Sequence, residues 1–295
     1  MKNKLVLLIL ILTTLAIVGC CSGDNEANPF DVAYNPSRSH KHLVLFGVAA
    51  TEPEPAVEAE FKQTDGIGTS SLYEIDTEDG TATLIGDIGY RVNAIAYDAH
   101  TKKLYGTATG PAEDVVDSIV PNQFISGSQL IEINMNTGAG TLIGETGQQT
   151  DCLTFNSSGT LFAWNYNNDG LCTINLTTGI ATPLGPSIGT YSNNLGLAFN
   201  NSDVLYLIYS YHYAHLATMN QTTGTATLIG SISGLPYSMA RNGDFHPVTG
   251  EYWGLDATSD YTPTRNLLVI DIGTRTLENT IPTIDNLEAI TFGYK

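Results

Sequence analysis

The sequence lacks the residue patterns that mark the common enzyme classes. No Gly-x-Ser-x-Gly nucleophile elbow, His-Glu-x-x-His zinc motif, phosphate loop or dinucleotide-binding glycine pattern occurs in a suitable strand-to-helix context. The sequence therefore offers no conventional catalytic constellation, and an enzymatic activity would have to rest on scattered side chains.

Basic residues are also scarce. The chain has 12 Lys and Arg against 30 Asp and Glu, for a formal net charge of −18. An N-terminal leader carrying Lys2 and Lys4 and no acids would leave a mature charge of −20 when removed (−18 minus 2). Such a surface repels phosphate backbones, so nucleic acid is not expected as a partner. It suits cations or basic partners, although solubility alone explains most acidic surfaces.

Long hydrophobic segments are absent except at the N-terminus. The apolar run from Leu5 to Val18 is shorter than the roughly 20 residues that a membrane span needs. It follows two lysines and precedes a small residue and a cysteine, which is typical of a secretory leader. We therefore expect residues 1–19 to be a signal peptide.

The end of this leader, Ile17-Val18-Gly19-Cys20, resembles a bacterial lipobox. The resemblance implies cleavage before Cys20 and a lipid on its thiol, which anchors the chain to a membrane without spanning it. Asp24 and Glu26 resemble the acidic export signal of surface lipoproteins in Bacteroidetes; a merely polar tether is the alternative. We expect an exported protein on the bacterial membrane, with the outer membrane favoured and the surface-facing or periplasmic side left open.

Residues 20–41 are polar and lack periodicity, which predicts a lipidated flexible tether. The remaining segment, residues 42–295, is long enough for one all-β domain.

Four short strands, called a to d here, recur five times along residues 42–295. Strand b has an apolar-aromatic core in Leu45-Phe46-Gly47, Leu104-Tyr105-Gly106, Leu161-Phe162-Ala163, Leu205-Tyr206-Leu207 and Tyr252-Trp253-Gly254. Strands c and d form hairpins such as Leu72–Gly86. Their turns carry Asp79-Gly80, Thr137-Gly138, Thr178-Gly179 and Thr223-Gly224. Glycine supplies the positive φ that these turns need.

A period of roughly 40 to 60 residues with four strands matches a β-propeller blade better than a sandwich. Strand a, as in Ala94–Tyr97, is small and apolar on both faces, which predicts the innermost position. Strand d is rich in Thr and includes Pro183, which predicts the outer edge. Because the repeats begin at strand b (Leu45) and end at strand a (Phe292), the last strand should complete the first blade. The expected fold is a five-bladed β-propeller closed by its C-terminal strand.

The repeat Leu-Tyr-x-Ile-Asp…Thr-Gly-x-Ala-Thr-x-Ile-Gly…Leu-Ala-Phe…Leu-Tyr-Gly resembles that of secreted bacterial β-propellers of uncharacterised function. The resemblance covers about residues 42–295 and implies the fold, while propellers host many functions. The fourth copy of strand a departs from it, since Arg241-Asn242-Gly243-Asp244-Phe245 replaces the usual apolar residues.

The d-to-a and b-to-c connections of antiparallel blades lie on one face, called the loop face here, and the a-to-b and c-to-d turns lie on the opposite turn face. The long inserts at residues 51–70 and 110–128 belong to the loop face, which favours that face for function. It also collects aromatic side chains that suit protein or glycan surfaces. The predicted ligand-binding residues are Tyr90, Tyr191, Tyr237, Tyr211, His212 and Tyr213. Filling of gaps between blades is the alternative role for some of these rings.

A second candidate site is the mouth of the central channel, where residues just before strand a converge by symmetry. Asn93, Asp151 and Glu288 could hold Ca²⁺, which would resemble lactonase-type propellers, although those have six blades. Asp151 with Glu288 could also mimic the paired carboxylates of five-bladed glycosidases. Arg241 would oppose a cation there, and a solvated charge network is the competing interpretation. A lone His212-x-x-His215 pair is a weak metal signal.

The chain contains only four cysteines. Cys20 is the expected lipid site and Cys21 adjoins it, which leaves Cys152 on strand a and Cys172 on strand c of one blade. Two strand spacings separate them by about 9–10 Å. A disulfide reaches no further than roughly 7 Å between Cα atoms. We predict two buried free thiols.

The sequence thus favours a non-enzymatic binding or scaffold module on the cell envelope, with an envelope protein or glycan as partner and no required cofactor. The alternative is a metal-assisted or carboxylate-dependent hydrolase at the channel mouth. Asp151 and Glu288 in a closed pocket, with a metal-sized gap and perturbed environments, would favour the enzyme. A wide, wet channel with Arg241 paired to an acid would favour the binding module.

Overall fold

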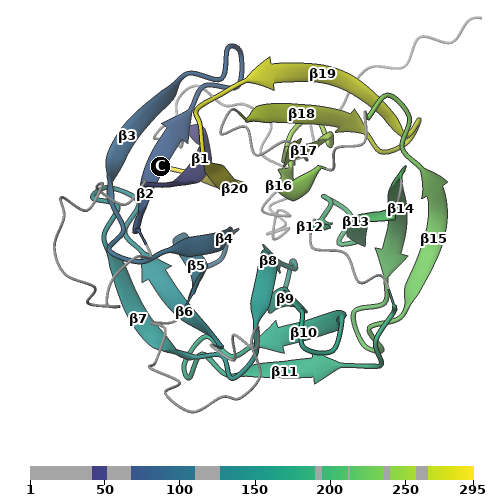
Figure 1. Cartoon of the computed structure of the whole chain (residues 1–295), viewed down its shortest axis with the longest axis horizontal. Helices are drawn as coiled ribbons and strands as arrows, with labels where there is room; N and C mark the ends of the chain where they lie inside the picture. Colours follow the sequence, from purple (N-terminus) through teal and green to yellow (C-terminus); the bar gives the residue numbers. More distant parts are fainter. Residues whose placement is uncertain are drawn as a thin grey trace, which may run out of the picture. The chain divides into compact units, whose positions relative to one another are not determined.

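A computed structural model describes residues 42–51, 68–109, 127–189, 195–211, 213–235, 240–256 and 265–295. All of them fall in one compact unit that spans Asn35–Lys295. The described part is all-β, with five four-stranded antiparallel sheets arranged as the blades of a ring (Figure 1). In this part of the chain, no helix has the length and apolar character of a membrane span. The fold is the expected five-bladed β-propeller.

Each blade is ordered from its inner to its outer strand. Blade 1 contains β20 (Leu287–Tyr294), β1 (Leu43–Ala50), β2 (Ser70–Ile75) and β3 (Ala82–Asp87). Blade 2 contains β4 (Val92–Asp98), β5 (Lys103–Thr109), β6 (Ser128–Ile133) and β7 (Gly140–Glu145). Blade 3 contains β8 (Thr150–Phe155), β9 (Leu161–Asn165), β10 (Gly170–Ile174) and β11 (Ala181–Leu184). Blade 4 contains β12 (Leu195–Phe199), β13 (Leu205–Tyr211), β14 (Tyr213–Met219) and β15 (Ala226–Ser231). Blade 5 contains β16 (Arg241–Phe245), β17 (Tyr252–Leu255), β18 (Asn266–Asp271) and β19 (Thr276–Pro282).

The side-chain pattern explains the inner and outer positions. Every residue of β12 is buried, as expected for a strand covered on both faces. The outermost strand of the same blade, β15, is exposed along most of its length, and Leu228 is 59% exposed. The predicted order a, b, c, d from the axis outward is therefore confirmed.

The C-terminal strand closes the ring. β20 pairs antiparallel with β1 along its length, with Phe46 opposite Thr291 and Val48 opposite Ala289. The outer edge is also joined, because the Thr283 hydroxyl of blade 5 donates to the Gly80 carbonyl of blade 1 at 2.9 Å. The two ends of the propeller sequence thus share one sheet.

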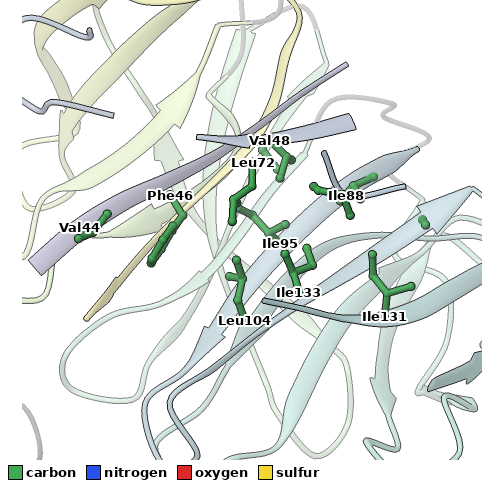
Figure 2. Close-up of a cluster of buried hydrophobic side chains, with 12 residues drawn as sticks. Val44, Phe46, Val48, Leu72, Ile88, Ile95, Leu104, Ile131 and Ile133 are labelled. Carbon is green, nitrogen blue, oxygen red and sulfur yellow. The ribbon is translucent and has the colours of Figure 1, made fainter. Parts of the chain in front are cut away.

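The hydrophobic core consists of five clusters, one between each pair of neighbouring blades. Between blades 1 and 2, Phe46, Val48 and Leu72 pack against Ile95 and Leu104 (Figure 2). Trp164 is fully buried between blades 3 and 4, and Trp253 lies between blades 5 and 1. Both tryptophans therefore pack in the core between blades.

The regular glycines of the repeat serve the contacts between blades. Gly138 adopts a φ of 82° in its hairpin turn, as predicted. A Cβ added to Gly86 would overlap the Thr137 carbonyl of the next blade, and one on Gly144 would overlap Thr178 in the same way. The Thr-Gly and Ile-Gly pairs are therefore close-approach sites between successive outer hairpins.

Cys152 lies in β8 and Cys172 in β10, with β9 between them. Both thiols are buried and free. The prediction drawn from strand spacing is confirmed.

Candidate functional site

The inner strands become irregular where they enter from the loop face. Four of them, β4, β8, β16 and β20, shift register against their neighbours near this end, and Figure 1 shows all of them near the centre of the ring. Val92 lies opposite Ala108 and Ala94 opposite Thr107, so Asn93 is the extra residue in β4. The corresponding shifts involve Cys152, Asn242 and Glu288. β-Bulges re-aim side chains, and here they surround the axis.

Asn242 is the centre of this arrangement. Its side-chain amide nitrogen donates to the Asn93 carbonyl at 3.0 Å, the Glu288 carbonyl at 3.0 Å and Asp151 Oδ1 at 3.3 Å. Its Oδ1 accepts from the Cys152 thiol at 2.9 Å. Asn93, Asp151, Cys152, Asn242 and Glu288 are called the axial cluster below. One buried amide thus connects the inner strands of blades 1, 2, 3 and 5.

The backbone of Asn242 is adapted to this role. Its φ is 43°, a left-handed conformation that Asn tolerates better than most residues. The following residue, Gly243, has no space for a side chain, because a Cβ there would overlap the Trp253 carbonyl. The unusual Arg-Asn-Gly-Asp sequence is therefore required by local geometry rather than being a degenerate copy of strand a.

Cys152 connects the axial cluster to blade 4, the one blade that the described contacts of Asn242 do not reach. It also has a positive φ, 50°, and its thiol lies 3.0 Å from the Leu195 carbonyl at the start of β12. Burial raises the pKa of this thiol well above its ordinary value, and the nearby Asp151 carboxylate raises it further. The thiol thus serves as a neutral donor in the axial cluster.

Asp151 is held by three donors. Its own strand contributes the Cys152 N–H at 2.9 Å, Asn242 contributes its amide, and the Tyr166 hydroxyl donates to Oδ2 at 3.2 Å. Burial nevertheless raises the pKa of Asp151 to about 6, and these bonds together with the charge of Arg241 limit the rise. A carboxyl that titrates near pH 6 is a suitable proton donor or acceptor in chemical terms.

Glu288 is surrounded by arginines. Arg241 Nη2 lies 2.8 Å from Glu288 Oε2, and Arg91 Nη2 lies 3.6 Å from Oε1. Arg265 donates through Nε to the carbonyl of the preceding residue, Leu287, at 3.3 Å. The interpretation of a charge network is confirmed for Arg241 with Glu288, whereas Asp151 interacts with Arg241 only at longer range.

A second buried carboxyl lies deeper along the inner strands. Asp244 Oδ2 accepts from the Thr291 hydroxyl at 2.8 Å and the Phe292 N–H at 3.0 Å, which join blade 5 to blade 1. Burial raises the pKa of Asp244 to about 6, while the bonds from Phe292, Thr291 and Phe245 counteract the rise. Thr291 in turn accepts from the Tyr97 N–H of blade 2 at 3.3 Å. These contacts strengthen the part of the ring where the chain ends meet.

The structure therefore brings together all three residues predicted at the channel mouth, Asn93, Asp151 and Glu288. The oxygens of this set already have partners: Asn93 Oδ1 accepts from the Thr109 hydroxyl at 3.2 Å, and Glu288 is paired with arginine. Among the described residues, no group of three or more His, Cys, Asp or Glu side chains is arranged to hold a metal ion. The cation and hydrolase roles predicted for this set stay predictions.

The predicted aromatic contacts are placed in part. Tyr213 is 69% exposed at the tip of the β13–β14 hairpin on the loop face. Tyr90 is half-buried against the core between blades 1 and 2, and its ring lies beside Gly140, which agrees with gap filling. Tyr191, His212 and Tyr237 lie outside the described residues, as do the side chain of Tyr211 and the lipidation site Cys20.

Sequence reasoning did not identify Asn242, Cys152, Arg91 or Arg265 as members of this site. The one available signal was the break in the repeat at residues 241–245, where polar residues replace an apolar inner strand. Such a break in an otherwise regular array indicates a specific role for the replaced positions.

No family model matches the chain, and no curated protein matches its sequence. Among solved structures, it is similar to a protein of unknown function from Bacteroides caccae (10% identity, 86% of this chain and 99% of that one, TM-score 0.47). A protein of unknown function from Bacteroides thetaiotaomicron matches at 12% identity over 82% of this chain, with a TM-score of 0.46. TolB from Acinetobacter baumannii matches at 9% identity over 85% of this chain and 66% of that one, with a TM-score of 0.47. The chain spans 64% of the Bacteroides thetaiotaomicron protein, less than two thirds of its length. Likeness at this level carries no inference about function.

Proposed function

We propose that the chain is a lipid-anchored β-propeller of the bacterial cell envelope that binds an envelope protein or glycan through its loop face. The leader ending at Cys20 supports both the anchor and a role outside the cytoplasm. The fold supports a scaffold, since closed rings of blades present rigid loop surfaces.

One observation carries the preference for binding over hydrolysis. The Asn242 amide, a hydrogen-bond donor, occupies the centre between the Asn93 carbonyl, the Glu288 carbonyl and Asp151. A hard cation coordinated by these oxygens would need that position. Glu288, the second predicted acid, is neutralised by Arg241. We therefore infer that the axial cluster has a structural role, in which it holds the inner strands together beneath the loop face.

A single feature favours the alternative, a carboxylate-dependent hydrolase. Asp151 has a pKa of about 6 and contacts the Tyr166 hydroxyl, so it could exchange protons near neutral pH. If Asp151 is a general acid or base, Asp151→Asn should abolish hydrolysis of oligosaccharide and lactone substrates in a protein that circular dichroism still shows to be folded. A wild-type chain with no turnover of either substrate class would remove this alternative.

Affinity capture from the native envelope, with the full lipidated chain as bait, tests the binding function. Tyr213→Ser should lose the captured partner, because Tyr213 is 69% exposed on the loop face. Val248→Ser is the matched control, since Val248 is 75% exposed in the β16–β17 turn of the opposite face. Retention by the control and loss by Tyr213→Ser would support the proposal. Failure of the wild-type bait to retain any envelope component would contradict it.

The anchor has a separate test. Cys20→Ser should prevent incorporation of radiolabelled palmitate and release the protein from the membrane fraction. Cys21→Ser is the control and should keep both label and membrane association. A Cys20→Ser protein that still carries the label would exclude Cys20 as the lipid site.

A further inference from the structure

Arginine is concentrated at one place in this acidic protein. The sequence contains five arginines, and three of them, Arg91, Arg241 and Arg265, lie around Glu288 at the loop-face end of blade 1. They come from different elements: Arg91 precedes β4, Arg241 begins β16 and Arg265 precedes β18. These three residues are called the arginine cluster below. In a chain with a net charge of −18, the clustering calls for a specific cause.

The contacts leave much of this donor capacity unused. A guanidinium carries five N–H donors in a planar fork. Among the described residues, the cluster's contacts are two ion pairs to Glu288 and one bond to the Leu287 carbonyl. The buried Nε of Arg241 has no hydrogen-bond partner within the described part of the chain.

The charges are also only partly balanced at close range. Glu288 is the one carboxylate in direct ion-pair contact with the cluster in the described structure. Asp151 attracts Arg241 and Asp256 attracts Arg265 at longer range. The pKa of Arg265 is lowered by burial and then by the charge of Arg241, which shows that the two guanidiniums repel each other. Side-chain exposures of 31% for Arg91 and 18% for Arg241 leave the cluster half-buried and in contact with solvent.

We propose that the arginine cluster is a binding subsite for an oxyanion, and specifically for the carboxylate group of a small organic ligand. This proposal rests on the proposed binding function of the loop face and adds a chemical class of ligand to it. Arg forks match carboxylates in plane and spacing, and partial burial strengthens such contacts. Glu288 shows that a carboxylate fits between Arg91 and Arg241, and the free donors of Arg241 and Arg265 provide the further contacts that a second carboxylate needs.

The surrounding charge gives phosphate no clear advantage over a monovalent carboxylate. Asp151, Asp256 and Glu288 lie close enough to act on the arginines. These three carboxylates offset the charge of the three guanidiniums, so the second negative charge of phosphate gains little net attraction. A singly charged, planar carboxylate is therefore sufficient for the site.

Ligand-observed NMR on the full chain in detergent micelles tests this subsite, with propionate, its uncharged analogue propionamide, and inorganic phosphate as probes. We expect propionate to bind and propionamide not to bind. Arg91→Gln and Arg265→Gln should each weaken propionate binding about tenfold, since each removes a charged donor. Glu288→Gln should strengthen it, because the internal competitor is lost. Arg275→Gln, in the β18–β19 turn on the opposite face, is the matched control and should change nothing.

Equal binding of propionate and propionamide would overturn the proposal, and so would propionate binding that survives both Arg91→Gln and Arg265→Gln. Binding of phosphate without propionate would overturn the assignment to carboxylates. If propionate fails to bind while capture of an envelope partner still depends on Tyr213, this subsite is wrong and the binding function stands. If propionate binds as expected while no partner is captured, the subsite stands and the envelope partner is wrong.

Discussion

The outer hairpins and the inner strand ends of this propeller follow opposite rules. The outer hairpins repeat nearly the same residues, and their carboxylates are exposed: hydrogen bonds from the backbone of Thr81 and Thr274 lower the pKa of Asp79 and Asp271. At the inner ends, bulged strands meet at the axis, and burial raises the pKa of Asp151 and Asp244 to about 6. The exposed outer hairpins therefore use the same residues in successive blades, whereas each buried inner strand end uses its own residues.

The difference reflects what each region contacts. An outer hairpin packs against an equivalent hairpin of the next blade. The same contact can therefore recur from blade to blade, as Gly86 against Thr137 and Gly144 against Thr178 do. Around the axis, five inner strands converge on a space that one side chain can fill. Asn242 fills it, and the symmetry of the repeat has to be broken there.

The largest expected effect comes from removing an inner strand. Deletion of Leu287 to Lys295 takes away β20, the partner of β1 and the acceptor of the Asn242 and Arg265 contacts. We expect loss of the native state, seen as loss of a cooperative thermal transition in circular dichroism. The rim substitution Leu84→Ser is the control, and it should cost less than about 0.5 kcal/mol because Leu84 is exposed. A deletion variant with an unchanged melting temperature would refute closure through β20.

A smaller effect is expected at the outer rim. Gly86→Ala introduces a Cβ that overlaps the Thr137 carbonyl, so it should reduce the free energy of unfolding by about 2 kcal/mol in urea titrations. Gly89→Ala, three residues away, is the matched control. It has a φ of 79° and no atom within 4 Å of a new Cβ. It should therefore cost only the backbone strain, about 1 kcal/mol. Equal losses in the two variants would show that the contact between blades contributes nothing.

The smallest effect concerns pH. The folded-state pKa of Asp244 is about 6, above the unfolded value of about 3.9, so the folded state binds more protons between these values. The contribution of Asp244 is therefore present in full at low pH and is lost as pH rises through 6. Lowering the pH from 7 to 5 should raise the free energy of unfolding by about 1 kcal/mol for this group.

Asp244→Asn isolates that contribution, because acidification also relieves general repulsion in a chain of net charge −18. The variant should be less stable, since Asp244 accepts bonds from Thr291 and Phe292, and its stability should depend less on pH. An identical pH dependence in wild type and variant would contradict the assigned pKa.

The regular part of this architecture was predictable from the sequence. The positions of strands a to d follow from the fivefold recurrence of their segments, from the Thr-Gly turns, from the small apolar residues of strand a and from Pro183 in strand d. Strand phase also predicted the free thiols of Cys152 and Cys172. These features depend on local sequence and on contacts that every blade repeats.

The axial cluster could be predicted only in part. Symmetry placed Asn93, Asp151 and Glu288 near one another, because each is the second residue of an equivalent inner strand. It could not identify Asn242, whose role depends on a φ of 43°, on a bulge and on partners 46 to 149 residues away. Arg265 was missed for the same reason, since a residue in the link before β18 contacts Leu287 only once the ring has closed.

Native-state amide hydrogen exchange on Asn242→Ala tests most directly whether the axis joins the blades into one unit. Asn175→Ala is the matched control, because Asn175 only caps an outer turn through the Thr177 and Thr178 amides. We predict that Asn242→Ala lowers protection in β4, β8, β16 and β20 together by on the order of 2 kcal/mol, whereas Asn175→Ala affects only the β10–β11 hairpin. A loss of protection confined to β16 in Asn242→Ala would contradict the account.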